Sequence, residues 1–112
     1  MSKFGLYSDE SVIPFENHVE GLEEQTKISL LDLRNFVKSL DNNVIEEVVP
    51  HRIVYAKSLT FRTFLDIQPK RDSLTISLRK SKSESIMIQT VKTIEDIDNA
   101  KPQIVEAYEK IK

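Results

Sequence analysis

The sequence predicts an α+β fold, a two-layer sandwich in which an antiparallel sheet of three to five strands carries two helices on one face. Apolar residues recur at helical spacing in two segments, residues 24–40 and residues 94–111. Between these segments apolar and polar residues alternate, which is typical of strands with one covered side. We therefore expect a helix, a sheet and a second helix in chain order.

The length of 112 residues is usual for one domain. Residues 1–21 contain Pro14 and both glycines and show no sustained period, so we expect an N-terminal arm whose order stays open. Residues 22–112 are expected to form the single α+β domain. The chain has no Cys, no signal-peptide core and no run of about eighteen apolar residues, and we expect a cytoplasmic protein that does not contact a membrane.

The first helix is predicted by six apolar residues that recur at helical spacing between residues 28 and 40. We expect it to begin near Glu24 and to end near Leu40. Thr26 or Ser29 is expected to cap its start. The polar run at residues 41–43 is expected to end it, because Asn tolerates the left-handed backbone found after helices.

The middle of the chain predicts strands at residues 44–49, 53–56, 60–68, 74–78 and 86–89. Pro50 is expected to close the first strand, and the run at residues 69–72 is expected to turn the chain. In the third segment, alternation assigns one face to Phe61, Thr63, Leu65 and Ile67. It assigns the opposite face to Arg62, Phe64, Asp66 and Gln68.

The second helix is predicted by a stripe of Ile94, Ile97, Ile104, Tyr108 and Ile111. Thr93 and Asp96 have the spacing of a capping box in which Asp replaces the usual Glu or Gln. Pro102 conflicts with this helix, since Pro removes one backbone hydrogen bond and costs about 3 kcal/mol inside a helix. Either the helix kinks at Pro102, or residues 94–100 form a separate turn.

The charge of the chain is unevenly distributed. Residues 50–82 hold eight Lys or Arg against two Asp or Glu, in a chain whose formal net charge is −2. Both flanking segments are acidic. Because the basic segment is also the strand-rich one, we expect its charges to gather on one surface and to attract an acidic partner.

The open face of the sheet is the predicted binding surface, centred on Tyr55, Lys57, Arg62, Phe64 and Arg79. Further polar residues expected on this face or at its ends are Asp66, Gln68, Lys70, Arg71, Thr75, Ser77, Lys80 and Lys82. Cations interleaved with aromatic rings suit single-stranded nucleic acid, whose phosphates need positive charge and whose bases stack. The alternative is an ordinary solvated face, on which Lys and Arg discourage pairing between molecules.

The sequence indicates no catalytic residues, no metal site and no cofactor. His18 lies between Glu16 and Glu20, but zinc needs three or four ligands on a rigid framework. Glu46 and Glu47 would point to opposite faces of a strand, and we expect them to be solvated. The two isolated glycines exclude a glycine-rich phosphate loop.

Several motifs carry a resemblance to a known family. They are a helix ending in Ser39-Leu40-Asp41, the paired glutamates before Pro50, the stretch IVYAK, the run FLDIQPKRDSLTISL and the ending AYEK. Together they resemble an uncharacterised small domain labelled "predicted transport protein", akin to YdhG-like and YjbR-like domains. The resemblance spans roughly residues 18–112 and implies an α+β fold that occurs alone or behind restriction-endonuclease-like nuclease domains. It implies no catalytic residues, and the polarity of the chain does not support the label of transport.

Three hypotheses for function follow. The first is a non-catalytic binding module that contacts an acidic partner, above all nucleic acid, through the basic sheet face. The second is a protein-interaction or homo-oligomerisation domain, for instance a homodimer, that uses a sheet edge or the terminal helix. The third is a small ligand-binding domain or enzyme with a pocket between the sheet and the helices.

Overall fold

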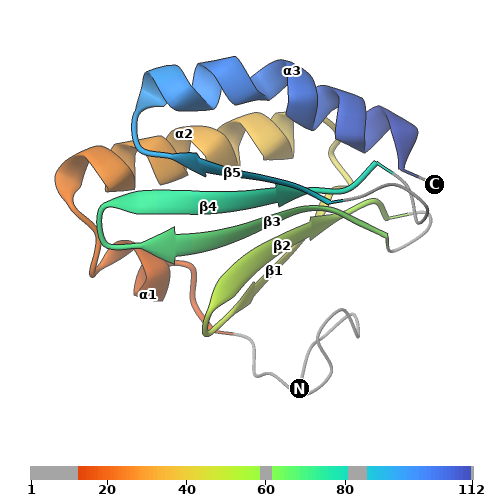
Figure 1. Ribbon diagram of the computed structural model, residues 1–112. Helices are drawn as coiled ribbons and strands as arrows, with labels where there is room; N and C mark the ends of the chain where they lie inside the picture. Colours follow the sequence, from red (N-terminus) through yellow and green to blue (C-terminus); the bar gives the residue numbers. More distant parts are fainter. Residues whose placement is uncertain (1–12, 59–61, 81–85, 112) are drawn as a thin grey trace.

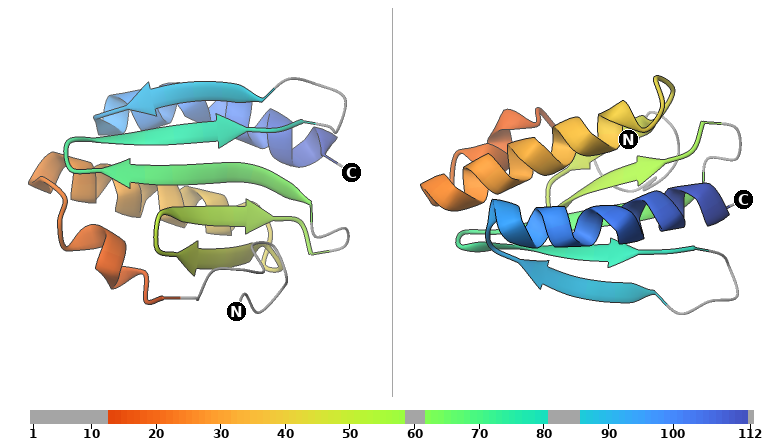
Figure 2. Two further views of the ribbon diagram at one scale, coloured as in Figure 1. Left: turned by 60° about the horizontal axis from the view of Figure 1, so that its bottom comes forward. Right: turned by 90° about the horizontal axis from the view of Figure 1, so that it is seen from above.

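The computed structural model describes residues 13–58, 62–80 and 86–111 (Figure 1). In chain order its elements are α1 (Glu16–Val19), α2 (Glu24–Ser39), β1 (Ile45–Val49), β2 (Arg52–Ala56), β3 (Thr63–Lys70), β4 (Ser73–Leu78), β5 (Met87–Val91) and α3 (Ile94–Lys110). The five strands form one antiparallel sheet in the order β1-β2-β3-β4-β5. Helices α2 and α3 lie side by side on one face of this sheet (Figures 1 and 2). The predicted two-layer α+β fold is confirmed.

The core lies between the sheet and the two long helices. Cross-strand register places Ile53, Ile67 and Ile76 in one row on the covered face of the sheet, and all three are fully buried. Helix α2 contributes Leu30, Leu33 and Val37 to the same cluster, and α3 contributes Ile97 and Ile104. In the described part of the chain, no helix is long and apolar enough to cross a membrane.

Helix α2 begins and ends where the sequence predicts, but the predicted cap is wrong. The residue that precedes the helix is Glu23, and no side-chain hydrogen bond caps this start within the described residues. Thr26 and Ser29 lie inside the helix on its buried face, and the Ser29 hydroxyl donates to the carbonyl of Gln25 at 2.9 Å. The start is held instead by Glu23 N–H, which donates to the carbonyl of Arg71 in the β3–β4 turn at 2.8 Å.

Strand β3 ends two residues later than predicted, because Pro69 and Lys70 belong to it and pair with Leu74 and Ser73. The turn is therefore shorter than the expected run of residues 69–72. Pairing between β2 and β3 ends at Ile67, so Pro69 lies where β3 has no described partner on the β2 side. Pro69 has no backbone N–H, and at this position its absence removes no hydrogen bond between β2 and β3.

Helix α3 is one continuous helix that contains Pro102. The alternative in which residues 94–100 form a separate turn is therefore wrong. The capping box is confirmed: Asp96 N–H donates to Thr93 Oγ1 at 3.1 Å, and Thr93 N–H donates to Asp96 Oδ2 at 3.3 Å.

The described end of the N-terminal segment, residues 13–21, packs against the domain. Phe15 belongs to the core cluster and is 6% exposed. Ile13 N–H donates to the carbonyl of Val48 at 2.9 Å, and His18 Nε2 lies 2.6 Å from the carbonyl oxygen of Val49. This segment therefore lies along β1. The rest of the predicted arm, residues 1–12, lies outside the described residues.

Candidate binding site on the open face of the sheet

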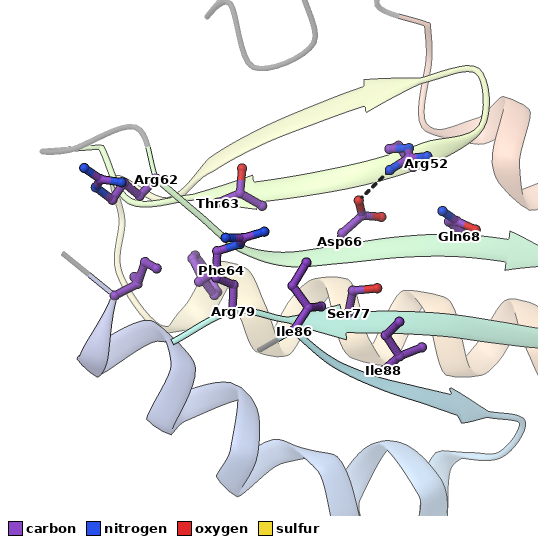
Figure 3. Close-up of a pocket in the computed structure, with 11 residues that line it drawn as sticks. Arg52, Arg62, Thr63, Phe64, Asp66, Gln68, Ser77, Arg79, Ile86 and Ile88 are labelled. Carbon is purple, nitrogen blue, oxygen red and sulfur yellow. Dashed lines mark hydrogen bonds and ion pairs between the residues drawn. The ribbon is translucent and has the colours of Figure 1, made fainter. Parts of the chain in front are cut away.

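The face of the sheet opposite the helices is crossed by one row of neighbouring side chains. Successive strand pairs place Glu47 beside Val54, Val54 beside Asp66, Asp66 beside Ser77 and Ser77 beside Ile88. A hollow of about 550 Å³ lies on this open face, towards β5 (Figure 3). We call it the open-face hollow, and it is the candidate site.

Positive charge dominates the lining of the open-face hollow. Among the described residues, Arg52, Arg62 and Arg79 line it together with one carboxylate, that of Asp66. Arg52 Nη1 lies 2.9 Å from Asp66 Oδ2 in an ion pair between β2 and β3, drawn as a dashed line in Figure 3. The backbone N–H of Arg79 donates to the carbonyl of Phe64 at 3.1 Å, but its guanidinium makes no hydrogen bond or ion pair with any residue that the structure describes. The lining thus offers at least one cation that has not been neutralised.

The wall of the hollow on the β5 side is apolar. Ile86 is 45% exposed and Ile88 is 66% exposed, and both line the hollow beside Arg79 and Ser77 (Figure 3). An exposed apolar wall next to arginine is typical of a surface that contacts a partner, because a purely solvated face carries polar groups. The site therefore suits a partner that has both negative charge and apolar surface.

Of the five predicted binding residues, Arg62, Phe64 and Arg79 line the hollow. Tyr55 does not. It is fully buried on the covered face, beside Leu65, and its hydroxyl donates to Glu46 Oε2 at 2.7 Å. The expectation that Tyr55 belongs to the open face is wrong, because side chains alternate along β2 and those of Ile53 and Tyr55 point towards the helices.

The prediction that the Phe64 side chain lies on the open face is also wrong. The β2–β3 register shifts between Tyr55 and Ala56, which pair with Leu65 and Thr63, so Phe64 is the extra residue of a β-bulge. A bulge breaks the alternation of side chains. Phe64 is fully buried, and its ring meets that of Tyr108 of α3 edge to face, with centroids 5.2 Å apart. It borders the hollow but presents no ring to solvent.

Lys57 contributes to the fold at the end of α3 and does not line the hollow. Its Nζ donates to the carbonyl of Ile111 at 3.0 Å and lies 4.7 Å from the ring centroid of Tyr108. A cation at the C-terminal end of a helix is favoured by the helix dipole. Lys80 likewise pairs with Glu106 of α3.

The remaining basic residues lie elsewhere. Lys70 and Arg71 are exposed at the β3–β4 turn, and Lys82 lies outside the described residues. The expected gathering of the whole basic segment on one surface is therefore wrong for four of its seven described basic residues. Three arginines do gather at the hollow.

Glu46 and Glu47 point to opposite faces as predicted, but neither is solvated. Glu46 is 13% exposed and accepts two hydrogen bonds from Arg34 of α2, both at 2.9 Å. Burial raises the pKa of Glu46, but hydrogen bonds from Arg34 and Tyr55 and the positive charges of Arg34 and Lys38 outweigh burial, so the net pKa is lowered. Glu46 is thus committed to holding α2 on the sheet, and sequence spacing gave no signal of this cluster.

Glu47 is 2% exposed, and neither of its carboxylate oxygens has a hydrogen-bond partner in the part of the chain that the structure describes. It lies on the open face beside Val54, not among the residues that line the hollow. Within the described residues, no group of three or more His, Asp or Glu side chains is placed to hold a metal ion.

Comparison with protein-family models, with curated proteins and with solved structures finds no match to this chain. The resemblance to the small domains akin to YdhG-like and YjbR-like domains stays a prediction. Any function must therefore be argued from the geometry of the site.

Proposed function

We propose that this protein is a non-catalytic binding module that holds an acidic partner in the open-face hollow. The observation that carries the proposal is the position of Arg79, which lines the hollow beside the exposed Ile86 and Ile88 and whose guanidinium has no partner among the described residues. A guanidinium binds carboxylates and phosphates through a rigid fork of donors. An anionic group seated there would gain a charge-assisted hydrogen bond.

The apolar wall favours an acidic protein segment over single-stranded nucleic acid. Nucleic acid that binds a sheet face needs aromatic rings on which its bases stack. Phe64 is the one aromatic residue that lines the hollow in the described part of the chain, and it is fully buried. Exposed isoleucines instead suit the aliphatic side chains of a protein, so we place the acidic protein first and nucleic acid second.

The test compares two cations at opposite ends of the sheet. Arg79→Gln removes the charge at the hollow, and Lys70→Gln is the matched control because Lys70 is exposed at the β3–β4 turn. Fluorescence anisotropy at low and physiological salt would follow a labelled Glu-rich peptide and a labelled single-stranded oligonucleotide. We expect Arg79→Gln to weaken peptide binding about tenfold, the equivalent of one charge-assisted hydrogen bond, and Lys70→Gln to leave it unchanged.

Two results would overturn the proposal. Equal peptide affinity of the wild type and the Arg79→Gln variant would remove the hollow from the binding surface, and so would a complete lack of peptide binding. Tighter, Arg79-dependent binding of the oligonucleotide would show that the partner is a nucleic acid and that the acidic-protein assignment is wrong.

A further inference from the structure

Strand β5 forms a free edge of the sheet. It pairs with β4 on one side, and no described backbone group donates to or accepts from its other side. Both views in Figure 2 show no described element beyond β5 in the plane of the sheet. The opposite edge differs, because the carbonyl of Val48 in β1 accepts the N–H of Ile13. Only β5 therefore leaves a full row of outward backbone groups available among the described residues.

The composition of β5 does not protect this edge. The run from Ile86 to Val91 contains no charged residue and no proline, and Ile86, Met87 and Ile88 are 45%, 38% and 66% exposed. Edge strands are normally guarded by charges, prolines or bulges, because an unguarded edge pairs with another strand. An unguarded and apolar edge indicates a strand that receives a partner.

We propose that β5 binds an extended acidic segment of a partner protein as a sixth strand of the sheet. This inference rests on the proposed function, since the same hollow supplies the positive charge. The hollow continues onto β5 through Ile86 and Ile88 and is lined by Arg79 one strand further in. The backbone of the segment would bond to the outer edge of β5, while its acidic side chains would face the hollow.

Strand spacing makes this contact feasible. Neighbouring strands lie about 4.8 Å apart, so an added strand would lie about 10 Å from β4. A Glu side chain that extends over Ile88 would pack its methylene groups on that isoleucine and bring its carboxylate towards Arg79, whose long side chain reaches back. Side chains on the other face of the added strand would meet Met87.

The charges around β5 also predict where the acidic residues of the segment lie. Arg79 lies level with the end of β5 that begins with Ile86, because Leu78 pairs with Met87. Arg52 lies towards the other end, but it is paired with Asp66, and Val91 there leads into α3, whose first turn carries Glu95 and Asp96. Acidic residues would be attracted to the first end and repelled at the second. In an antiparallel arrangement, they would therefore lie in the C-terminal half of the segment.

The experiment uses a synthetic peptide of about eight residues, the length of one strand, in which Glu and Val alternate. Two N-methylated versions have identical side chains and carry N-methyl groups at the odd or at the even positions. A strand directs alternate N–H groups to opposite sides. We expect one version to bind at least about tenfold more weakly and the other to retain its affinity, because only one set of N–H groups faces β5. Equal affinities of the two versions would overturn the sixth-strand proposal.

Amide hydrogen exchange of the full chain supplies the second measurement. Saturating peptide should slow exchange at alternate residues of β5 and leave β1 unchanged. If Arg79→Gln weakens binding but β5 amides are not slowed, the proposed function stands and the sixth strand is wrong. If no acidic peptide binds, both fail. The β5 amides could also be slowed without peptide, at protein concentrations where light scattering shows a dimer. The strand that pairs with β5 would then be a second copy of the chain, and the assignment to an acidic segment of another protein would be wrong.

Discussion

Replacing Tyr55 with Phe should reveal how strongly the buried cluster around Glu46 holds the two layers together. The Tyr55 hydroxyl donates to Glu46 Oε2 at 2.7 Å, and Glu46 also accepts two bonds from Arg34 of α2. A hydrogen bond to a charged group contributes about 1.5–3 kcal/mol. Since Glu46 would keep both bonds from Arg34, we expect a loss near the lower end of that range, about 1.5–2 kcal/mol.

Denaturant unfolding followed by circular dichroism measures this loss as a fall in the midpoint at constant slope. Tyr108→Phe is the matched control, because the Tyr108 hydroxyl also donates to a carboxylate, that of Asp41 at 2.8 Å, but at the exposed surface. There water replaces the lost bond, and the change should stay within about 0.5 kcal/mol. Equal effects of the two substitutions would refute the reasoning, since burial would then make no difference.

The same cluster predicts a dependence on pH. Because the net pKa of Glu46 is lowered in the folded protein, its stabilisation is complete above the ordinary Glu pKa of about 4.3 and is lost as the pH falls through the folded pKa. Burial raises the pKa of Tyr55 far above its usual range, so its hydroxyl stays protonated as a donor. Tyr55→Phe should move the pKa of Glu46 upward and make the acid loss of stability shallower than in the wild type.

Two further substitutions test α3. Thr93→Ala removes the hydroxyl that accepts from Asp96 N–H, and should lower the free energy of unfolding by about 1 kcal/mol. Thr93→Ser keeps the hydroxyl and should keep most of the stability of the wild type. A wild-type unfolding midpoint for Thr93→Ala would contradict the capping role. Pro102→Ala restores the backbone N–H that faces the carbonyl of Asp98. It should raise the free energy of unfolding by about 2 kcal/mol, because about 3 kcal/mol of helix penalty is removed and about 1 kcal/mol is lost when the unfolded chain becomes less restricted. A lower free energy of unfolding in denaturant would show that the helix depends on the proline.

The fold could be predicted because the spacing of apolar residues shows which side of each helix or strand is buried. Leu30, Leu33 and Val37 define the buried stripe of α2, and alternation through Leu74, Ile76 and Leu78 defines β4. Both patterns arise from local geometry and need no knowledge of the partner element. The helix cap could not be predicted in the same way, because the start of α2 is tied to Arg71, which is far away in sequence.

The site could be predicted only in part. Arg79 reaches the open face because it continues the alternation of β4, in which Ser77 lines the hollow and Leu78 is buried. Arg62 lines the hollow from the residue just before β3. Phe64 presents no ring to solvent on this face, because the bulge beside it is a property of the β2–β3 pairing and leaves no mark in the alternation of β3 itself. The ion pair of Arg52 and Asp66 likewise depends on cross-strand register, which requires the turns to be placed first.

The cations of residues 50–82 serve different purposes, and this has a measurable consequence for any nucleic acid that binds. The segment carries a net charge of six, from eight basic and two acidic residues, but Lys57 and Lys80 hold α3 and Arg52 is paired with Asp66. For single strands the logarithm of affinity falls with the logarithm of salt at a slope of about −0.7 for each phosphate neutralised.

If the whole segment contacted an oligonucleotide, the slope would be about −4, whereas Arg79 alone predicts about −0.7. A salt titration of the labelled oligonucleotide distinguishes these values, with Arg79→Gln expected to bring the slope close to zero. A slope near −4 that survives Arg79→Gln would mean that the cations at α3 and at the β3–β4 turn bind phosphate too, and that the open-face hollow is not the centre of the site.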